Sequence, residues 1–167
     1  MNVTKGWLGD FLDLPESAAE IAKDLTMSGS KVETFSCWND SISRVVVGHL
    51  LEVADHPNSD HLKVCKVDVG ESEPVQIITG AQNIKAGDYV PAALDNSLLP
   101  NGVKIKKGKL RGLPSNGMLC SLGELNLNTG NFPTCIEDGI MILPGEYTPG
   151  TPIDEALGLN DPMIEFE

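Results

Sequence analysis

Hydrophobic positions recur at helical spacing near the amino terminus of this chain and at strand spacing further on. A short helix is predicted over 4–12, capped by Thr4, with an apolar side formed by Trp7, Leu8, Phe11 and Leu12. A second helix is predicted between Ser17 and Gly29. Ser17 and Glu20 have the spacing of a capping box, and Ala18, Ile21, Ala22 and Leu25 follow at helical period. Two such helices bury little surface alone, so we expect them to need a partner surface.

From Ile42 onward the pattern is that of short strands. Residues 44–54 form a long β-branched run, in which Gly48 predicts a bulge or sharp bend. In the next strand the apolar positions change from even to odd numbers at Cys65, which predicts a second bulge. Further strands are predicted at 75–78, 89–94, 103–105 with 110–111, and 140–143, between glycine-rich turns. Short strands at this spacing predict a small closed barrel.

The carboxyl-terminal residues return to a mixed pattern. A short helix is predicted over 154–157, and Ile164 and Phe166 then alternate with acids as they would at the start of a strand. Because the pattern stops within that strand, we expect the chain to be a fragment of a longer protein. The predicted divisions are a helical or mixed segment over 1–39, the barrel over 40–150, and a returning segment over 151–167.

Charge is distributed unevenly along the 167 residues, whose net formal charge is −12. Residues 42–150 carry nine Lys or Arg against twelve Asp or Glu, whereas the flanks carry three against twelve. Within the middle, one run without acids gathers Lys104, Lys106, Lys107, Lys109 and Arg111. Such a cationic cluster suits a polyanionic ligand, and it equally suits a solvated edge strand that resists aggregation.

Several other kinds of site are not indicated. The four cysteines are too far apart in sequence for a CxxC pair, so we do not expect structural zinc. We expect the cysteines to be buried free thiols. His56 and His61 near Asp60 lack a third ligand, so we assign no metal site. No nucleophile with its base and no phosphate-cradling loop is present, and we assign no catalytic residue. Without an apolar run of about 18 residues or a signal peptide, we expect a cytoplasmic protein that does not contact a membrane.

Three runs in this order resemble the signature of a known RNA-binding family. They are His-Pro-Asn-Ser-Asp-His-Leu-Lys-Val-Cys at 56–65, Thr-Gly-Ala-Gln-Asn at 79–83, and Arg-Gly at 111–112 followed by Ser-Asn-Gly-Met-Leu-Cys-Ser at 115–121. Together they resemble the OB-fold tRNA-binding domain. The ends, with Gly-Trp-Leu at 6–8, the run 21–33, and the closing 157–159 and 164–167, resemble the amino-terminal part of bacterial phenylalanyl-tRNA synthetase beta subunits.

The resemblance implies a mainly β (α+β) fold in which a five-stranded OB barrel is inserted into a small discontinuous α/β domain made by the two chain ends. It implies a noncatalytic fragment that assists tRNA binding while a phenylalanine-tRNA ligase charges tRNA for protein biosynthesis. The parent enzyme would work with an alpha subunit as a heterotetramer. It would use ATP and Mg²⁺ bound outside this segment, so no cofactor is expected here.

In that interpretation, phosphates would pair with Lys104, Lys106, Lys107, Lys109 and Arg111, and the turns would offer polar contacts from Asn58, Asn83, Ser115 and Asn116. Asparagine is also common in turns for conformational reasons alone. Tyr89 is the only aromatic ring available for stacking before Phe132 within the barrel, which favours weak, salt-sensitive binding. Two alternatives stay open: a free-standing tRNA-binding or chaperone-like OB protein, and an architectural module that braces a synthetase.

Overall fold

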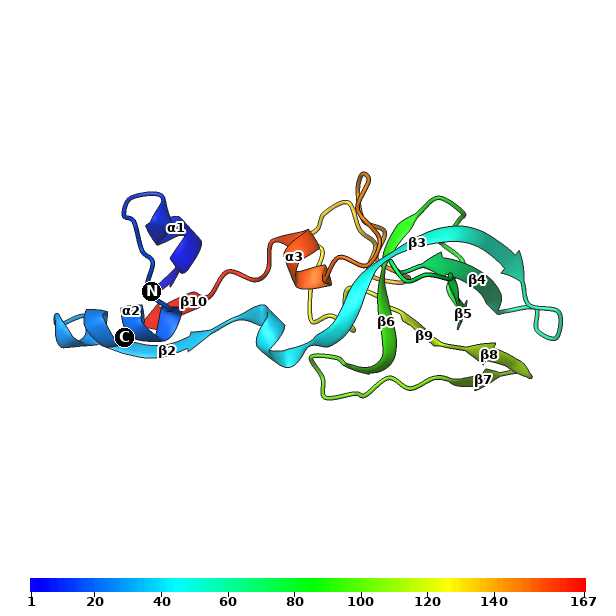
Figure 1. Cartoon of the computed structure of the whole chain (residues 1–167), viewed down its shortest axis with the longest axis horizontal. Helices are drawn as coiled ribbons and strands as arrows, with labels where there is room; N and C mark the ends of the chain where they lie inside the picture. Colours follow the sequence, from blue (N-terminus) through cyan, green and yellow to red (C-terminus); the bar gives the residue numbers. More distant parts are fainter. The chain divides into compact units, whose positions relative to one another are not determined.

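The computed structural model describes residues 1–167 and has two units, one made of 1–40 with 157–167 and the other of 41–156. Figure 1 shows the elements of both. A 3₁₀ helix at Trp38–Ser41 and α3 at Ile153–Leu157 lie where the chain passes between them. None of the helices has both the length and the apolar character that crossing a bilayer requires.

The unit formed by the chain ends is a three-stranded antiparallel sheet with two helices. Its sheet has the order β1-β10-β2, from β1 (Asn2–Thr4), β10 (Met163–Phe166) and β2 (Val32–Ser36). The predicted strand at the carboxyl end is confirmed as β10, whereas β1 and β2 have no counterpart among the predicted elements.

Both helices of this unit begin at the predicted caps. Thr4 caps α1 (Lys5–Gly9), which ends earlier than predicted, so Phe11 and Leu12 lie in the following turn. In α2 (Ala18–Met27) the Ser17 hydroxyl accepts from the Glu20 amide, and the Glu20 carboxylate accepts from the Ser17 amide at 2.9 Å. This reciprocal pair satisfies amides that a helix start would otherwise leave unbonded.

The unit over 41–156 is a five-stranded antiparallel barrel of the OB type, so the predicted mainly β class is confirmed. The strand order is β5-β4-β3-β6-β9, from β3 (Ser43–Asp55), β4 (Lys63–Asp68), β5 (Val75–Thr79), β6 (Tyr89–Leu98) and β9 (Gly117–Leu119). The outer strands β5 and β9 come together through the residues just before β9. The Asn116 amide donates to the Gln76 carbonyl at 2.8 Å, and the Ile78 amide donates to the Ser115 hydroxyl at 3.0 Å.

The inner face of the barrel is apolar and closely packed. Its core includes Leu50, Val67, Ile77, Val90 and Leu119, all with at most 2% of their surface exposed. Gly48 lies within this packing, because a Cβ added there would come within 2.6 Å of the Val67 side chain. The glycine therefore permits a close approach of strands and does not mark the predicted bulge.

The register irregularities fall elsewhere than predicted. They lie in β3, between residues 43 and 45 and between 50 and 52. Strand β4 pairs with β5 without interruption, so the predicted bulge at Cys65 is wrong. The apolar positions of this strand change from even to odd numbers because Val64 points outward and is half buried, whereas Cys65 and Val67 point inward and are buried.

Two predicted strands are also corrected. Residues 103–105 make only one bridge, between Lys104 and Leu98, and the strands follow as a hairpin of β7 (Gly108–Leu110) and β8 (Leu113–Ser115). Residues 140–143 form no strand. They are held to the barrel by single amide bonds, from Met141 to the Cys120 carbonyl and from Leu143 to the Tyr89 carbonyl. The short strand β9 was not predicted.

Candidate nucleic-acid interface

The cationic run lies in the connection between β6 and β9, and its far end is the β7–β8 hairpin. Leu110 pairs with Leu113, so Arg111 and Gly112 alone form the turn between the two strands. Both have positive φ, +49° and +91°, which is the combination that a two-residue type I′ hairpin requires. This geometry puts the exposed Arg111 at the tip of the hairpin.

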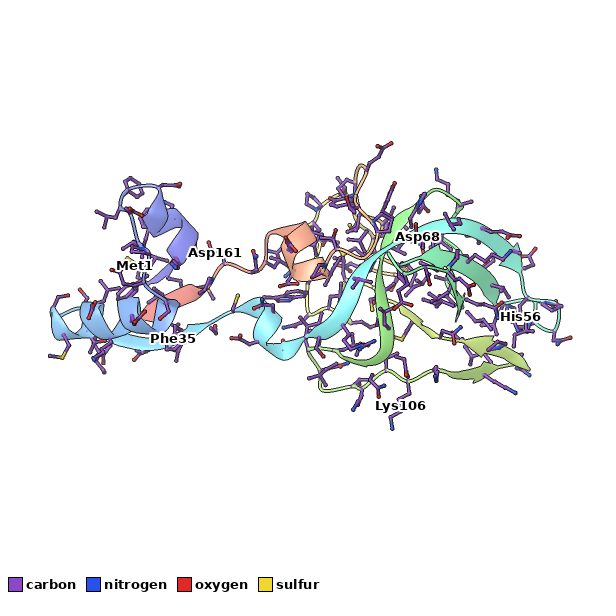
Figure 2. All side chains as sticks on the ribbon, viewed as in Figure 1. Met1, Phe35, His56, Asp68, Lys106 and Asp161 are labelled. Carbon is purple, nitrogen blue, oxygen red and sulfur yellow. The ribbon has the colours of Figure 1, made fainter.

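The earlier half of the run is held against β6 by backbone bonds. Asn96 donates its amide to the Ile105 carbonyl, and the Ile105 amide donates to the Ser97 carbonyl at 2.9 Å. Ile105 is buried at 9% exposure, whereas Lys104 and Lys106 on either side are exposed. Alternation along an extended backbone therefore turns these two lysines toward solvent, as Lys106 illustrates in Figure 2.

The five cations keep their charge available. The ion pairs of the molecule join Lys31 to Glu167, Lys63 to Asp55 and Lys66 to Glu52, and none involves the cationic run. One carboxylate contacts the backbone of the run: that of Asp95 accepts from the backbone amide of Lys107 at 2.9 Å. All five side chains of the run are exposed: Lys104, Lys106, Lys107, Lys109 and Arg111.

Beneath the lysines lies a groove of about 280 Å³. Its apolar part is formed by Ile78, Ile105, Leu110 and Met118, and its rim by Lys104, Lys106 and Lys109. Met118, interpreted from the sequence as core, is only partly buried and lines this groove. An apolar floor with a cationic rim matches the two parts of a nucleotide, the flat base and the phosphate.

The turn after β3 reaches the hairpin tip. His56 is buried at 4% exposure, and its Nε2 lies 3.1 Å from the Leu110 carbonyl oxygen. The Asn58 backbone N–H donates to His56 Nδ1 at 3.0 Å, and the Asn58 side-chain amide donates to the Arg111 carbonyl at 3.4 Å. Asn58, a candidate RNA contact, thus lies beside the cationic run and is bonded to its backbone. No sequence pattern indicated the role of His56, because its partner is 54 residues away.

Two other candidate residues lie where the barrel closes. Ser115 is buried at 5% exposure, and its hydroxyl accepts from the Ile78 amide and donates to the Gly117 carbonyl, both at 3.0 Å. The Asn116 amide is bonded to Gln76, while its residue stays half buried. The Ser115 hydroxyl therefore accepts one hydrogen bond and donates another within the barrel.

Asn83 is not part of this group. Its side-chain amide donates to the Ile140 carbonyl at 2.9 Å and accepts from the Ile140 amide at 3.1 Å. A side chain that binds one peptide group in both directions fixes the segment at 140 to the turn after β5. The structure brings together the five cations and Asn58, with Ser115 and Asn116 at the base of the hairpin.

The thiols and acids of the chain form no reactive cluster. All four cysteines are free, as expected, and burial raises the pKa of Cys65 to about 11 and that of Cys120 to about 12. No three His, Cys, Asp or Glu side chains gather in an arrangement that could hold a metal ion.

Residues 45–152, which contain the barrel and the cationic run, match the family described as a putative tRNA binding domain. The chain belongs to this tRNA-binding domain family. The match begins in β3 and ends just before α3, so it covers the barrel and the closing segments around it.

Relatives of the tRNA-binding domain extend the similarity to the whole chain. A phenylalanine–tRNA ligase beta subunit of Clostridium acetobutylicum is 48% identical over 100% of this chain, and one of Lactiplantibacillus plantarum is 46% identical over 99%. The chain spans 21% of the length of each. Among solved structures, a MetRS related protein from Pyrococcus horikoshii is 23% identical with a TM-score of 0.44, covering 64% of this chain and 85% of its own.

Proposed function

We propose that residues 41–156 bind the sugar–phosphate backbone of tRNA with the cationic run. The observation that carries this proposal is that five exposed cations lie in one run between β6 and β9, while the rest of the chain is acidic. Three of them, Lys104, Lys106 and Lys109, line one groove. Because none is paired with a carboxylate, binding of a phosphate need not first break an ion pair. In OB folds the loop between the fourth and fifth strands is a usual nucleic-acid contact, and the run occupies that loop here.

The number of cations sets an expected salt dependence. Each phosphate contact contributes about −0.7 to the slope of log K against log salt for single strands, so five contacts predict a slope of about −3.5. The groove floor is aliphatic and not aromatic, which limits stacking energy. We therefore expect modest affinity that falls steeply as salt is added.

The test is charge reversal of Lys106, Lys107 and Arg111 to Glu. Retention of a tRNA transcript in a low-salt filter assay should be abolished. A matched control reverses Lys23, Lys31 and Lys85, which gives the same change in net charge away from the groove and should retain binding. Equal retention by both triple variants would remove the proposal, because overall charge would then explain the result.

For the longer protein, we propose the function of the relatives. A chain of this family would form the amino-terminal part of a cytoplasmic phenylalanine–tRNA ligase beta subunit that acts with an alpha subunit. The similarity over the whole chain to two such beta subunits supports this assignment. ATP and Mg²⁺ would bind in other parts of that enzyme.

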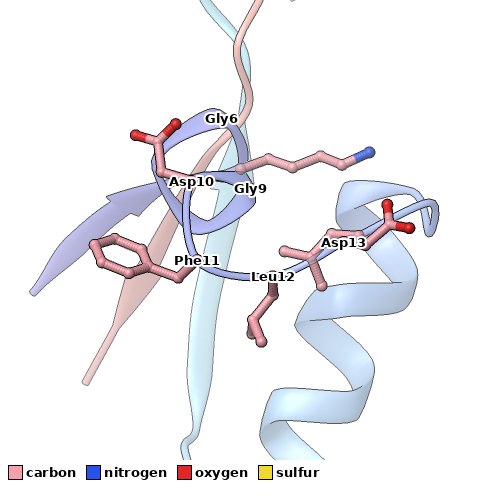
Figure 3. A pocket seen from close by; sticks show the side chains of 8 residues that line it. Gly6, Gly9, Asp10, Phe11, Leu12 and Asp13 are labelled. Atoms are coloured by element: carbon pink, nitrogen blue, oxygen red, sulfur yellow. The ribbon is translucent and has the colours of Figure 1, made fainter.

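A second, architectural role is favoured for the unit made by the chain ends. Its exposed apolar residues include Trp7 at 53%, Phe11 at 70% and Phe35 at 50%. Figure 3 shows Phe11 and Leu12 on the turn after α1, beside the hollow that this turn lines. Large exposed apolar side chains in one small unit suit a surface covered by another part of a longer protein.

The same substitution in two contexts tests this role. Phe11→Ser should cost the 167-residue chain about 0.5–1.5 kcal/mol, because the exposed ring still packs edge-on against Trp7. In a full-length subunit it should cost about 1.5–3 kcal/mol more, because further burial of the ring would be lost. Equal costs in both would argue against a bracing surface at Phe11.

A further inference from the structure

The β7–β8 hairpin has little of its own to hold it in place. Its strands share three residue pairs, and all three residues of β7 are exposed. An isolated two-stranded hairpin of this size is marginal in water. Strand β8 is fastened by the Gln76 side chain, which donates to the Pro114 carbonyl at 2.7 Å. The turn that begins at His56 provides the corresponding attachment for the β7 side.

The contacts of His56 fix its tautomer. Nδ1 faces the Asn58 backbone N–H at 3.0 Å, and since an amide can only donate there, Nδ1 must be the unprotonated acceptor. Nε2 then carries the hydrogen and donates to the Leu110 carbonyl at 3.1 Å. The ring is thus a buried bridge that joins the turn to the last residue of β7.

Asn58 adds a second bond one residue further toward the tip. Its side-chain amide donates to the Arg111 carbonyl at 3.4 Å, and Arg111 has the positive φ of the turn. Two successive backbone carbonyls, those of Leu110 and Arg111, are therefore bonded to the same short turn. Lys109 and Arg111, the two cations nearest the tip, extend from this attached backbone.

We propose that His56 is a positioning residue for RNA binding, acting with Asn58 as a latch that holds the hairpin so that Lys109 and Arg111 engage phosphates. The inference rests on the proposed function, and neither latch residue needs to touch the RNA. Without the latch, both cations remain in the chain but must be ordered at the moment of binding, which opposes their engagement. The latch therefore contributes to affinity without contributing charge.

The test is the salt dependence of tRNA binding by the 167-residue chain carrying His56→Ala. If Lys109 and Arg111 disengage, the slope of log K against log salt should become shallower by about 1.4, although no cation has been removed. Between two salt concentrations that differ fourfold, the wild-type Kd should then change about sevenfold more than that of the variant. A loss of folded protein alone would lower the active fraction and leave the slope unchanged.

Two companion variants sharpen the result. His56→Gln keeps a side-chain N–H for the Leu110 carbonyl and should restore part of the slope. His61→Ala removes an exposed histidine from the same turn and should behave as wild type. Should His56→Ala fail to fold, Asn58→Ala removes the side-chain bond to Arg111 and should make the slope shallower by about 0.7. Loss of an uncharged contact between Asn58 and RNA would instead raise the Kd and leave the slope unchanged.

A double-mutant cycle completes the design. Removing Lys109 and Arg111 by alanine substitution should reproduce the slope of His56→Ala, and adding His56→Ala to that pair should have no further effect. A wild-type slope in both latch variants, or additive effects in the cycle, would overturn the latch. Absence of salt-dependent tRNA binding by the wild-type chain would instead overturn the proposed function, so the two failures are distinct.

Discussion

Replacing Ser115 by alanine should destabilise the barrel and leave the RNA contact intact. The hydroxyl bonds the Ile78 amide and the Gly117 carbonyl at 3.0 Å each, at a position with 5% exposure. Leaving a buried polar group unsatisfied costs about 1–3 kcal/mol, and water can reach the Gly117 carbonyl more easily because that residue is half buried. We therefore expect a total loss of about 2–3 kcal/mol.

Urea unfolding measures this loss and can separate the two units. Both tyrosines, Tyr89 and Tyr147, belong to 41–156, whereas Trp7 and Trp38 belong to 1–40. The tyrosine-detected midpoint should fall by about 0.7–3 M in Ser115→Ala, given a slope of about 1–3 kcal/mol/M, while the tryptophan-detected transition stays in place.

A control at an exposed serine and a tRNA-binding measurement test this account of Ser115. Ser72→Ala, at an exposed position, should change the free energy of unfolding by less than about 0.5 kcal/mol. Under conditions where Ser115→Ala is folded, its salt slope for tRNA should equal that of wild type. An unchanged stability with weaker tRNA binding at a fixed salt concentration would show that the Ser115 hydroxyl contacts RNA directly and that the structural account is mistaken.

Three further outcomes can be checked on the same chain. Gly117→Ala should destabilise the barrel by several kcal/mol in urea unfolding, or prevent folding, because its Cβ would overlap the backbone carbonyl oxygen of Ala93 in β6. A thiol reagent added to the native protein at neutral pH should modify the partly exposed Cys37 well before Cys120, whose buried thiol has its pKa raised to about 12. The pKa of Glu20 is lowered from 4.5 by the Ser17 backbone amide and then by the Ser17 hydroxyl, so its contribution to α2 should be present above pH 4.5 and lost as the pH falls through the lowered value. Comparing acid unfolding of wild type and Glu20→Gln measures that contribution, and identical acid transitions would contradict it.

Local signals predicted local structure well. The Ser17 and Glu20 capping box is encoded within three residues, and the structure contains both of its hydrogen bonds. The register irregularity at residues 50–52 could not be located in the same way. It depends on how β3 pairs with β4, and no local pattern of apolar residues marks that position.

In the candidate site, too, local features could be predicted from the sequence and long-range contacts could not. The charge of the run at 104–111 is visible in the sequence, and alternation around Ile105 could have predicted which lysines are exposed. Arg-Gly between two leucines could also have indicated the two-residue turn, since glycine favours positive φ. The contact between His56 and Leu110 carries no such signal, because nothing local links residues so far apart in sequence.

The register of the small sheet has a consequence for how such a protein could be assembled. Ser36, the last residue of β2, pairs with Met163, the first residue of β10. The segment from Cys37 to Pro162 is therefore the connection of a β-hairpin formed by β2 and β10. A tight turn that joined Ser36 to Met163 would leave the strand pairings of the sheet unchanged. Replacing the barrel by another insert at this point would therefore preserve the strand pairings of the small sheet, provided that the bonds of α1 to Asp161 and Pro162 are kept.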